Sequence, residues 1–484
     1  MTKNFLIIAL TIALSASLFF NRRSFEFPGA DAKANPGPTP PQAVLEPPVP
    51  RYAAVESVLA VGAQMPGLRG AALGFCLLNA EGKTVVERLA GTAFIPASTL
   101  KTVTTATALQ RLGPDYRFST RVMSTAPIES GVLNGDVIVV GEGDPLLSLA
   151  DVAQWAARLR KMGLTEITGR VIGDGRYFQG SLFDDFWNWG DVGNGYGSGV
   201  SGLNLEHNRF TVAFLGAETE GGRPSVSSIL PEVPAVSMVS GVMTGQAGSG
   251  DNVVIYGGEK TGLITMRGTV PPAQETCVVG AVPDPPLFAA WHFHKALQEA
   301  GIAVLGPATS VSDLDENPLP STTELLVHQS PPLLELVTSI HATSDNHETE
   351  CLFRKMGVLA QQAPDELIRE HWKAQGLDFV GLRMEDGCGL ARADHIRPLD
   401  LARLQFAAAH GPHGPAYQAS LLSRGPLRWK GGAMSSIRSY TGYITSAGGE
   451  VFCFALMVNH YSDSKAVSEL RQKLVESVAS LQHK

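Results

Sequence analysis

The sequence lacks the features that mark nucleic-acid-binding proteins and zinc proteins. Its 484 residues hold 38 Lys and Arg against 46 Asp and Glu, a formal net charge of −8, so it has no basic excess to neutralise a phosphate backbone. Its five cysteines show no C-x-x-C spacing, and its twelve histidines no H-E-x-x-H. We therefore expect no nucleic-acid partner, no metal and no other cofactor. At 44% hydrophobic, the chain is long enough for two to four domains.

Long apolar runs are also missing, with one exception at the N-terminus. Lys3 precedes the run FLIIALTIALSASLFF, from Phe5 to Phe20, and the sequence NRR follows it. This pattern predicts that residues 1–27 are a secretory signal peptide or a signal anchor. The run is slightly shorter than the roughly 20 residues of a relaxed membrane span, yet arginines directly after it are atypical of a cleaved signal. Export is expected in both cases, with membrane anchoring through residues 5–20 as the open alternative.

Residues 28–50 are rich in proline and should form a semi-extended linker that cannot hold a packed core. Export would place the cysteines in an oxidising compartment, where a disulfide is chemically allowed. Because five is an odd number and no spacing selects a pair, small hydrophobic core residues are the favoured interpretation. The cysteines are Cys76, Cys277, Cys351, Cys388 and Cys453.

The rest of the chain predicts an α/β (α+β) domain that carries a large insertion. Residues 71–90 read as a β-hairpin, and the chain ends in three short strands followed by a helix. Together they predict an antiparallel sheet with flanking helices, built from residues 51–114 and 324–484. Residues 115–323 are short β-like runs cut by glycine and proline, which indicates a mostly β insertion of two modules.

The stretch FIPASTLK places Ser98 three residues before Lys101, where Pro96 can open a helix. On a helix these two side chains share one face. Taken alone, this spacing is typical of a helix-start serine with a solvated lysine one turn later. A nucleophile with its base is the alternative.

Two later signatures decide between these interpretations. STLK (98–101), SDN (344–346) and KGG (430–432) occur in the order of the S-x-x-K, S-D-N and K-T-G set of penicillin-binding enzymes. The longer stretches SGLNLEHNRF, TSDNHETECLFRKMG and EDGCGLAR also fit. Over about residues 55–480 the chain resembles the class C penicillin-binding proteins, which are D-alanyl-D-alanine carboxypeptidases and endopeptidases of bacterial cell walls. The 246 positions between Ser98 and Ser344 are typical of that class, whereas β-lactamases keep these motifs close.

The resemblance implies a penicillin-binding/β-lactamase-type transpeptidase domain and a role for each motif residue. Ser98 would be the acylated nucleophile and Lys101 its base. Ser344 would relay a proton to the leaving amine, Asn346 would hold the substrate amide, and Lys430 would face the terminal carboxylate of the peptide. Partners would be peptidoglycan peptides and β-lactam antibiotics, in the periplasm or cell envelope. Such a site needs no metal, because a nucleophile, a base and oxyanion donors suffice.

The third motif departs from its family. Gly431 stands where a threonine is usual, and Ala433 where a hydroxyl residue commonly follows the motif. Gly431, Gly432 and Ala433 are still expected to border the substrate, with the N–H of Ala433 as an oxyanion donor. A lost hydrogen bond to a charged group weakens binding about ten- to a hundred-fold or more. Arg438 in the next strand is a candidate replacement contact, with an ordinary surface arginine as the alternative.

These departures keep a second class of function open. A degenerate relative that binds wall peptide or a partner protein without hydrolysing it would tolerate the loss of both hydroxyls. A β-lactamase is less favoured, because of the long insertion and because no deacylating glutamate is recognisable.

Overall fold

The computed structural model describes residues 50–315 and 322–482. The predicted signal segment and the linker, apart from Pro50, lie outside the described residues. Within the described ranges, no helix has both the length and the apolar character needed to cross a bilayer.

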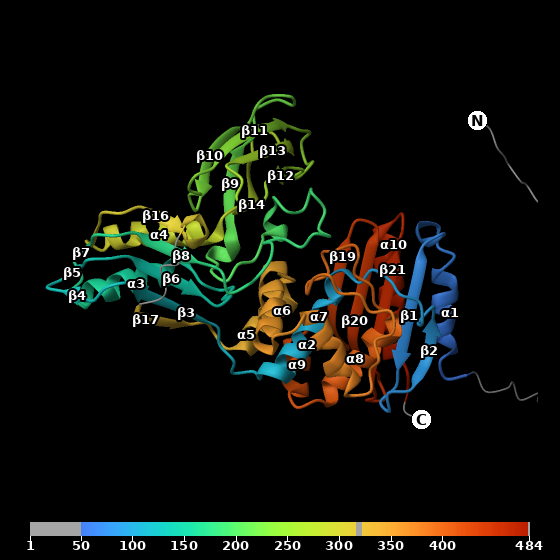
Figure 1. The fold of residues 1–484 in the computed structure, drawn as a ribbon. Helices are drawn as coiled ribbons and strands as arrows, with labels where there is room; N and C mark the ends of the chain where they lie inside the picture. The colour runs from blue at the N-terminus through green and yellow to red at the C-terminus, as the bar shows by residue number, and fades with distance from the viewer. Residues whose placement is uncertain (1–49, 316–321, 483–484) are drawn as a thin grey trace, which may run out of the picture. The chain divides into compact units, whose positions relative to one another are not determined.

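A six-stranded antiparallel sheet forms the centre of the catalytic part, in the order β18-β19-β20-β21-β1-β2 (Figure 1). Its strands are β1 (Ala72–Leu78), β2 (Thr84–Arg88), β18 (Leu422–Arg424), β19 (Leu427–Met434), β20 (Ile437–Thr445) and β21 (Val451–Asn459). The predicted N-terminal hairpin and three C-terminal strands are confirmed. Because β1 pairs with β21, the two ends of the described chain share one sheet.

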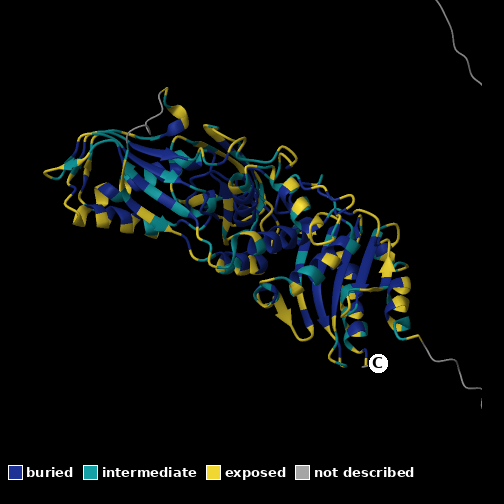
Figure 2. Cartoon of the chain, turned by 60° about the horizontal axis from the view of Figure 1, so that its bottom comes forward, coloured by how far each residue is buried: buried dark blue, intermediate teal, exposed yellow. Residues whose placement is uncertain are grey.

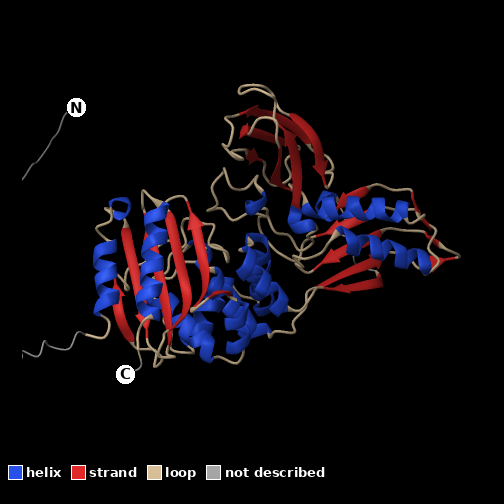
Figure 3. Cartoon of the chain, turned by 180° about the vertical axis from the view of Figure 1, so that it is seen from behind, coloured by secondary structure: helices blue, strands red, loops and turns tan. Residues whose placement is uncertain are grey.

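Helices cover both faces of this sheet (Figure 3). Strand β21 reads as one apolar run because its alternate residues enter two cores: Phe454 and Leu456 on one face, Ala455 and Met457 on the other. The first face packs against α1 (Ala53–Gly62) and α10 (Ser464–Ala479). The second faces α2 (Lys101–Leu112), α5 (Leu333–Thr343), α6 (Asn346–Ala360), α7 (Pro364–Lys373), α8 (Pro398–His410) and α9 (Gly414–Ser420). Figure 2 shows the central strands buried between these layers.

The inserted region contains two groups of strands. The first is the sheet β16-β8-β6-β3-β17, with a small sheet β15-β7-β5-β4 and two helices. Its elements are β3 (Ser119–Ser124), β4 (Ile128–Glu129), β5 (Val132–Leu133), β6 (Val137–Gly141), α3 (Leu149–Lys161), β7 (Glu166–Ile167), β8 (Val171–Asp174), α4 (Pro285–Glu299), β15 (Ala303–Val304), β16 (Ala308–Ser310) and β17 (Thr323–Gln329).

The second group interrupts the first between β8 and α4. Two three-stranded sheets form it, ordered β10-β9-β14 and β11-β13-β12. Its strands are β9 (Arg209–Leu215), β10 (Ser225–Leu230), β11 (Ser237–Thr244), β12 (Val254–Tyr256), β13 (Leu263–Val270) and β14 (Glu275–Ala281).

One expected boundary shifts. The predicted return to the catalytic part at residue 324 falls inside β17, which pairs with β3 of the insertion. The insertion therefore extends to about Gln329, and α5 follows it. The polar and apolar residues of β17 alternate too weakly to assign this strand to either part without its partner.

A long connection between β8 and β9 brings the insertion to the catalytic part. We call residues 181–196 of this connection the strap. Arg354 of α6 donates to the carbonyl of Ser181 at 2.7 Å, and Asn346 donates to the carbonyl of Tyr196 at 2.8 Å. Both ends of the strap are thereby tied to one helix.

Candidate active site

Ser98 and Lys101 lie at the start of α2. A 3-10 turn, Ala97–Thr99, precedes the helix, which begins at Lys101. Lys101 Nζ lies 3.0 Å from Ser98 Oγ. Ala97 adopts a left-handed φ of 46°, a strained conformation for a residue with a side chain, and such strain is common beside active sites. The sequence predicted this helix start, and the pair lies within hydrogen-bonding distance.

Lys101 is fully buried and has three polar neighbours. Besides Ser98 Oγ, they are Asn346 Oδ1 at 2.5 Å and the backbone carbonyl of Cys388 at 2.7 Å. Both of these oxygens can only accept a hydrogen bond. A neutral amine has two N–H groups and one lone pair, so donating to the two oxygens leaves the lone pair directed at Ser98. Burial lowers the pKa of Lys101, which favours that neutral form, while the negative charge of Asp386 opposes the shift.

The second motif forms the corner between α5 and α6. Ser344 has a left-handed φ of 63° and ends α5, and Asn346 begins α6. Lys430 of β19 donates to Ser344 Oγ at 2.7 Å and to the carbonyl of Gly431 at 2.9 Å. Burial, together with the nearby charge of Lys101, lowers the pKa of Lys430 to about 7. All three motifs therefore meet at one place.

The glycines of the third motif have different surroundings. A Cβ atom on Gly432 would lie 2.7 Å from the backbone nitrogen of Ser98, so only glycine fits there. A Cβ on Gly431 would lie 3.6 Å from the ring of Tyr440, an ordinary contact. Space therefore does not explain the glycine at 431, and a side chain would fit.

Two charged residues near the motifs do not line the cleft described below. Arg438 is paired directly with Ala433 in the sheet, so the two side chains lie on the same face. Ala433 lines the cleft, whereas Arg438 is not among the residues that line it. Asp345 accepts a hydrogen bond from Arg209 at 2.7 Å, and although burial acts in the opposite direction, this arginine holds the pKa of Asp345 below its ordinary value.

A cleft of about 410 Å³ opens at these motifs. Of the predicted site residues, Ser98, Ser344, Asn346 and Ala433 line it. The rest of its wall was not predicted from the sequence, and it comes from the strap, residues 389–392 and the end of β19. These residues are Asn188, Asp191, Tyr196, Gly389, Leu390, Arg392, Met434 and Ser435. Of these, only Gly389, Leu390 and Arg392 lie in a stretch that the sequence singled out, EDGCGLAR, which carries part of the family resemblance.

Loop 386–391 holds the Cys388 carbonyl that faces Lys101. The carboxylate of Asp386 accepts hydrogen bonds from four backbone N–H groups, those of Cys388, Gly389, Leu390 and Ala391, at 2.6–3.0 Å. The Cys388 thiol is fully buried, and burial raises its pKa well above the ordinary value. All five cysteines are free; Cys277 is exposed and the other four are buried, as small core residues would be.

Two groups of side chains in the described ranges are close enough to share a cation: His207 with Asp345 and Glu348, and Glu350 with Asp386 and Cys388. In the first, Asp345 is already paired with Arg209. In the second, the oxygens of Asp386 are taken up by backbone N–H groups. Neither group therefore offers an open set of ligands.

Comparison with known proteins assigns most of the chain to one family. The profile described as the D-Ala-D-Ala carboxypeptidase 3 (S13) family matches residues 54–481. The chain belongs to that family. The resemblance inferred from STLK, SDN and KGG is confirmed.

Curated relatives carry the corresponding names. A D-alanyl-D-alanine carboxypeptidase of Actinomadura sp. is 27% identical over 435 residues, which cover 82% of this chain and 79% of that one. A second, from Haemophilus influenzae, is 24% identical over 83% of this chain and 88% of its own length. The crystal structure of penicillin binding protein 4 from Haemophilus influenzae aligns with a TM-score of 0.74 at 22% identity, covering 88% of this chain and 98% of that one. The predicted fold class is thereby confirmed.

Proposed function

We propose that this member of the S13 family is a serine D-alanyl-D-alanine carboxypeptidase/endopeptidase that cleaves peptidoglycan stem peptides through an acyl-enzyme on Ser98. One observation carries the assignment: two acceptor oxygens around Lys101 Nζ leave its lone pair for Ser98 Oγ. Family membership and the names of the curated relatives support the substrate class.

Acylation begins when Lys101 accepts the proton of Ser98 and the serine oxygen attacks the carbonyl carbon of the penultimate D-alanine. The negative charge that develops on the carbonyl oxygen is stabilised by the backbone N–H groups of Ser98 and Ala433. Both residues line the cleft, and the absence of a side chain at Gly432 lets strand β19 lie directly against the turn that carries Ser98. The N-terminus of α2 adds a favourable dipole.

Collapse of the tetrahedral intermediate breaks the C–N bond. The proton held by Lys101 passes through Ser344 to the leaving amine, which departs as D-alanine or as the amino end of a cross-link. Lys430 donates to Ser344 and so orients its hydroxyl for that transfer. Water then hydrolyses the ester, and Ser98 regains its proton.

Substrate binding involves Asn346 and Lys430, and the strand residues Gly431, Gly432 and Ala433. Asn346 uses one lone pair on Lys101 and one N–H on the strap, which leaves one N–H and one lone pair for the peptide amide. Arg438 stays a weaker proposal for a carboxylate contact. If Arg438→Ala leaves the KM for a D-Ala-D-Ala peptide unchanged, that proposal fails.

Penicillins would acylate Ser98 by the same attack and form a stable ester. The Haemophilus influenzae protein has also been crystallised in complex with a β-lactam. Because its substrates are peptidoglycan peptides, the enzyme would act in the cell envelope. Residues 1–27 would direct its export. Anchoring through residues 5–20 belongs to the same proposal.

A non-hydrolytic peptide-binding relative is the second candidate, and Gly431 with Ala433 is the observation that favours it. Labelling of the protein with a fluorescent penicillin, with Ser98→Ala as control, separates the two. Label on the parent alone, with D-alanine released from a pentapeptide, supports the enzyme. Label without release indicates the binding relative, and no label contradicts an acyl-enzyme.

A further inference from the structure

The orientation of Lys101 depends on an oxygen that belongs to no side chain. The carbonyl of Cys388 accepts one of the two N–H groups of the neutral amine, and Asn346 accepts the other. If the carbonyl moved away, the amine could rotate and its lone pair would no longer be directed at Ser98. The position of loop 386–391 therefore sets the efficiency of the base.

The buried carboxylate of Asp386 accepts most of the hydrogen bonds that hold this loop. Asp386 is fully buried, and a charge in such a place is stable only when donors surround it. Four donors are the N–H groups of the loop itself. The fifth comes from the insertion: the indole Nε1 of Trp187 donates to Asp386 Oδ2 at 2.8 Å.

Trp187 is well placed to fix the loop. It belongs to the strap, is 6% exposed, and packs in a small apolar cluster with Val192, Cys388 and Leu390. It thus shares this cluster with the residue whose carbonyl faces Lys101, and it also adds a side-chain donor to those around Asp386.

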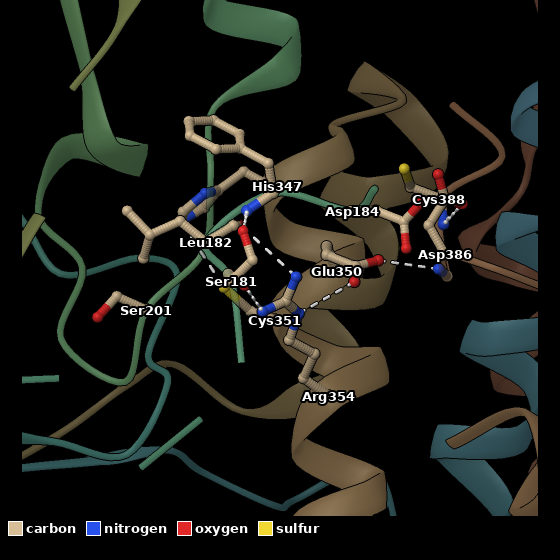
Figure 4. A network of polar contacts seen from close by, with 12 residues as sticks. Ser181, Leu182, Asp184, Ser201, His347, Glu350, Cys351, Arg354, Asp386 and Cys388 are labelled. Atoms are coloured by element: carbon tan, nitrogen blue, oxygen red, sulfur yellow. Dashed lines mark hydrogen bonds and ion pairs between the residues drawn. The ribbon is translucent and has the colours of Figure 1, made fainter. Parts of the chain in front are cut away.

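The strap is tied to the same loop by a second route, seen in Figure 4. Arg354 of α6 reaches the carbonyl of Ser181 and also donates to Glu350 at 3.2 Å. Glu350 accepts the N–H of Gly387 at 2.8 Å, inside the loop. Strap and loop are therefore joined by two routes, one through Asp386 and one through Gly387.

We propose that Trp187 is a positioning residue for the reaction: through Asp386 and the Cys388 carbonyl it keeps the lone pair of Lys101 directed at Ser98. The inserted region thereby takes part in the chemistry, although Trp187 itself does not line the cleft. This inference rests on the proposed function, since it requires acylation of Ser98.

The test removes the N–H of residue 187 and keeps its bulk. Two variants of the full chain do so: Trp187→Phe, and replacement of Trp187 by β-(benzothiophen-3-yl)alanine, which has nearly the same shape but carries sulfur in place of N–H. Stopped-flow acylation with a fluorescent penicillin then gives the noncovalent dissociation constant and the acylation rate constant separately. Each preparation is normalised by active-site titration, and its Tm is measured.

We expect the acylation rate constant to fall about tenfold or more in both variants, as loss of one hydrogen bond to a buried charge implies, while the noncovalent dissociation constant stays within about twofold. The matched control is Trp189→Phe, because Trp189 lies on the same strap but is 67% exposed and stacks on Tyr256. It should acylate like the parent.

Three results would overturn the proposal: an acylation rate constant within about twofold of the parent in both variants, a slow Phe variant beside a normal benzothiophene variant, or equal losses in binding and acylation. The second would show that Trp187 acts by packing, and the third that the cleft has collapsed. A parent chain that takes no label would instead contradict the proposed function.

Discussion

A Cβ atom on Gly432 would lie 2.7 Å from the backbone nitrogen of Ser98, although 334 positions separate the two residues. Strand β19 therefore runs directly against the turn that carries the nucleophile. The contact fixes where the N–H of the next residue, Ala433, can point.

We predict that Gly432→Ala loses at least about a hundredfold in acylation rate, because displacing the strand by about 1 Å moves an oxyanion donor out of reach. Its Tm should also fall, since the new methyl would clash with the Ser439 hydroxyl and would lie 2.8 Å from the Pro96 carbonyl oxygen. Gly431→Ala is the control for stability, because its methyl has room. Acylation at the parental rate in Gly432→Ala would contradict the close contact.

The buried amine of Lys430 should lower the free energy of unfolding. Its folded-state pKa of about 7 lies below the ordinary 10.5, so the unfolded chain binds more protons between these pH values. Lys430→Met should therefore be more stable than the parent at pH 7, by on the order of 2 kcal/mol, with the gap narrowing toward pH 10. Denaturant unfolding at several pH values measures it. Lys83→Met, at an exposed position, should show no such trend.

Glu350 should contribute to the pH dependence of acylation. Burial lowers the pKa of Lys101, and the charge of Glu350 opposes this effect, as do the larger contributions of Asp386 and Asp345. Burial raises the pKa of Glu350 itself to about 7. Glu350→Gln should therefore move the acid limb of the acylation profile to lower pH, because Lys101 then loses its proton more easily. An unmoved limb would refute this coupling; Glu469→Gln, on the surface, is the control.

Arg209 should stabilise the corner that carries the second motif. It pairs with Asp345, whose folded-state pKa is below its ordinary value, so this stability is present above about pH 4 and lost as the pH falls further. Arg209→Gln should lower the free energy of unfolding by about 3 kcal/mol at pH 7. This difference in unfolding free energy between Arg209→Gln and the parent should become smaller as the pH falls below about 4. An equal loss at pH 3 and pH 7 would show that packing, and not the ion pair, is responsible.

Ala433→Thr should improve binding of peptides that end in a carboxylate. Ala433 is exposed at the cleft, so a threonine there has room, and the resemblance places a hydroxyl at this position against the substrate carboxylate. One hydrogen bond to a charged group predicts a KM about tenfold lower for a D-Ala-D-Ala peptide. The same substitution should leave hydrolysis of a substrate without that carboxylate unchanged. An unaltered KM for the carboxylate peptide would mean that other groups already bind it.

The order of the three motifs and the alternation of the C-terminal strands were enough to predict the fold class and to bring Ser98, Lys101, Ser344, Asn346 and Lys430 into one site. Local rules apply in each case: a helix start, a corner between helices, a paired strand. The boundary at β17 could not be predicted in this way, because the sheet that a strand joins depends on the strand with which it pairs.

The chain by itself determined which groups can do chemistry, because the three motifs in their order carry the family resemblance that implies the nucleophile, the base and the missing hydroxyls. Only the tertiary structure decided how they are held. The carbonyl that orients Lys101 belongs to a backbone, and backbone carbonyls carry no sequence signal. The indole that steadies its loop lies 201 positions before Cys388, in a different part of the fold. Such contacts arise from packing, because a buried carboxylate takes its donors from whichever segment the fold brings near.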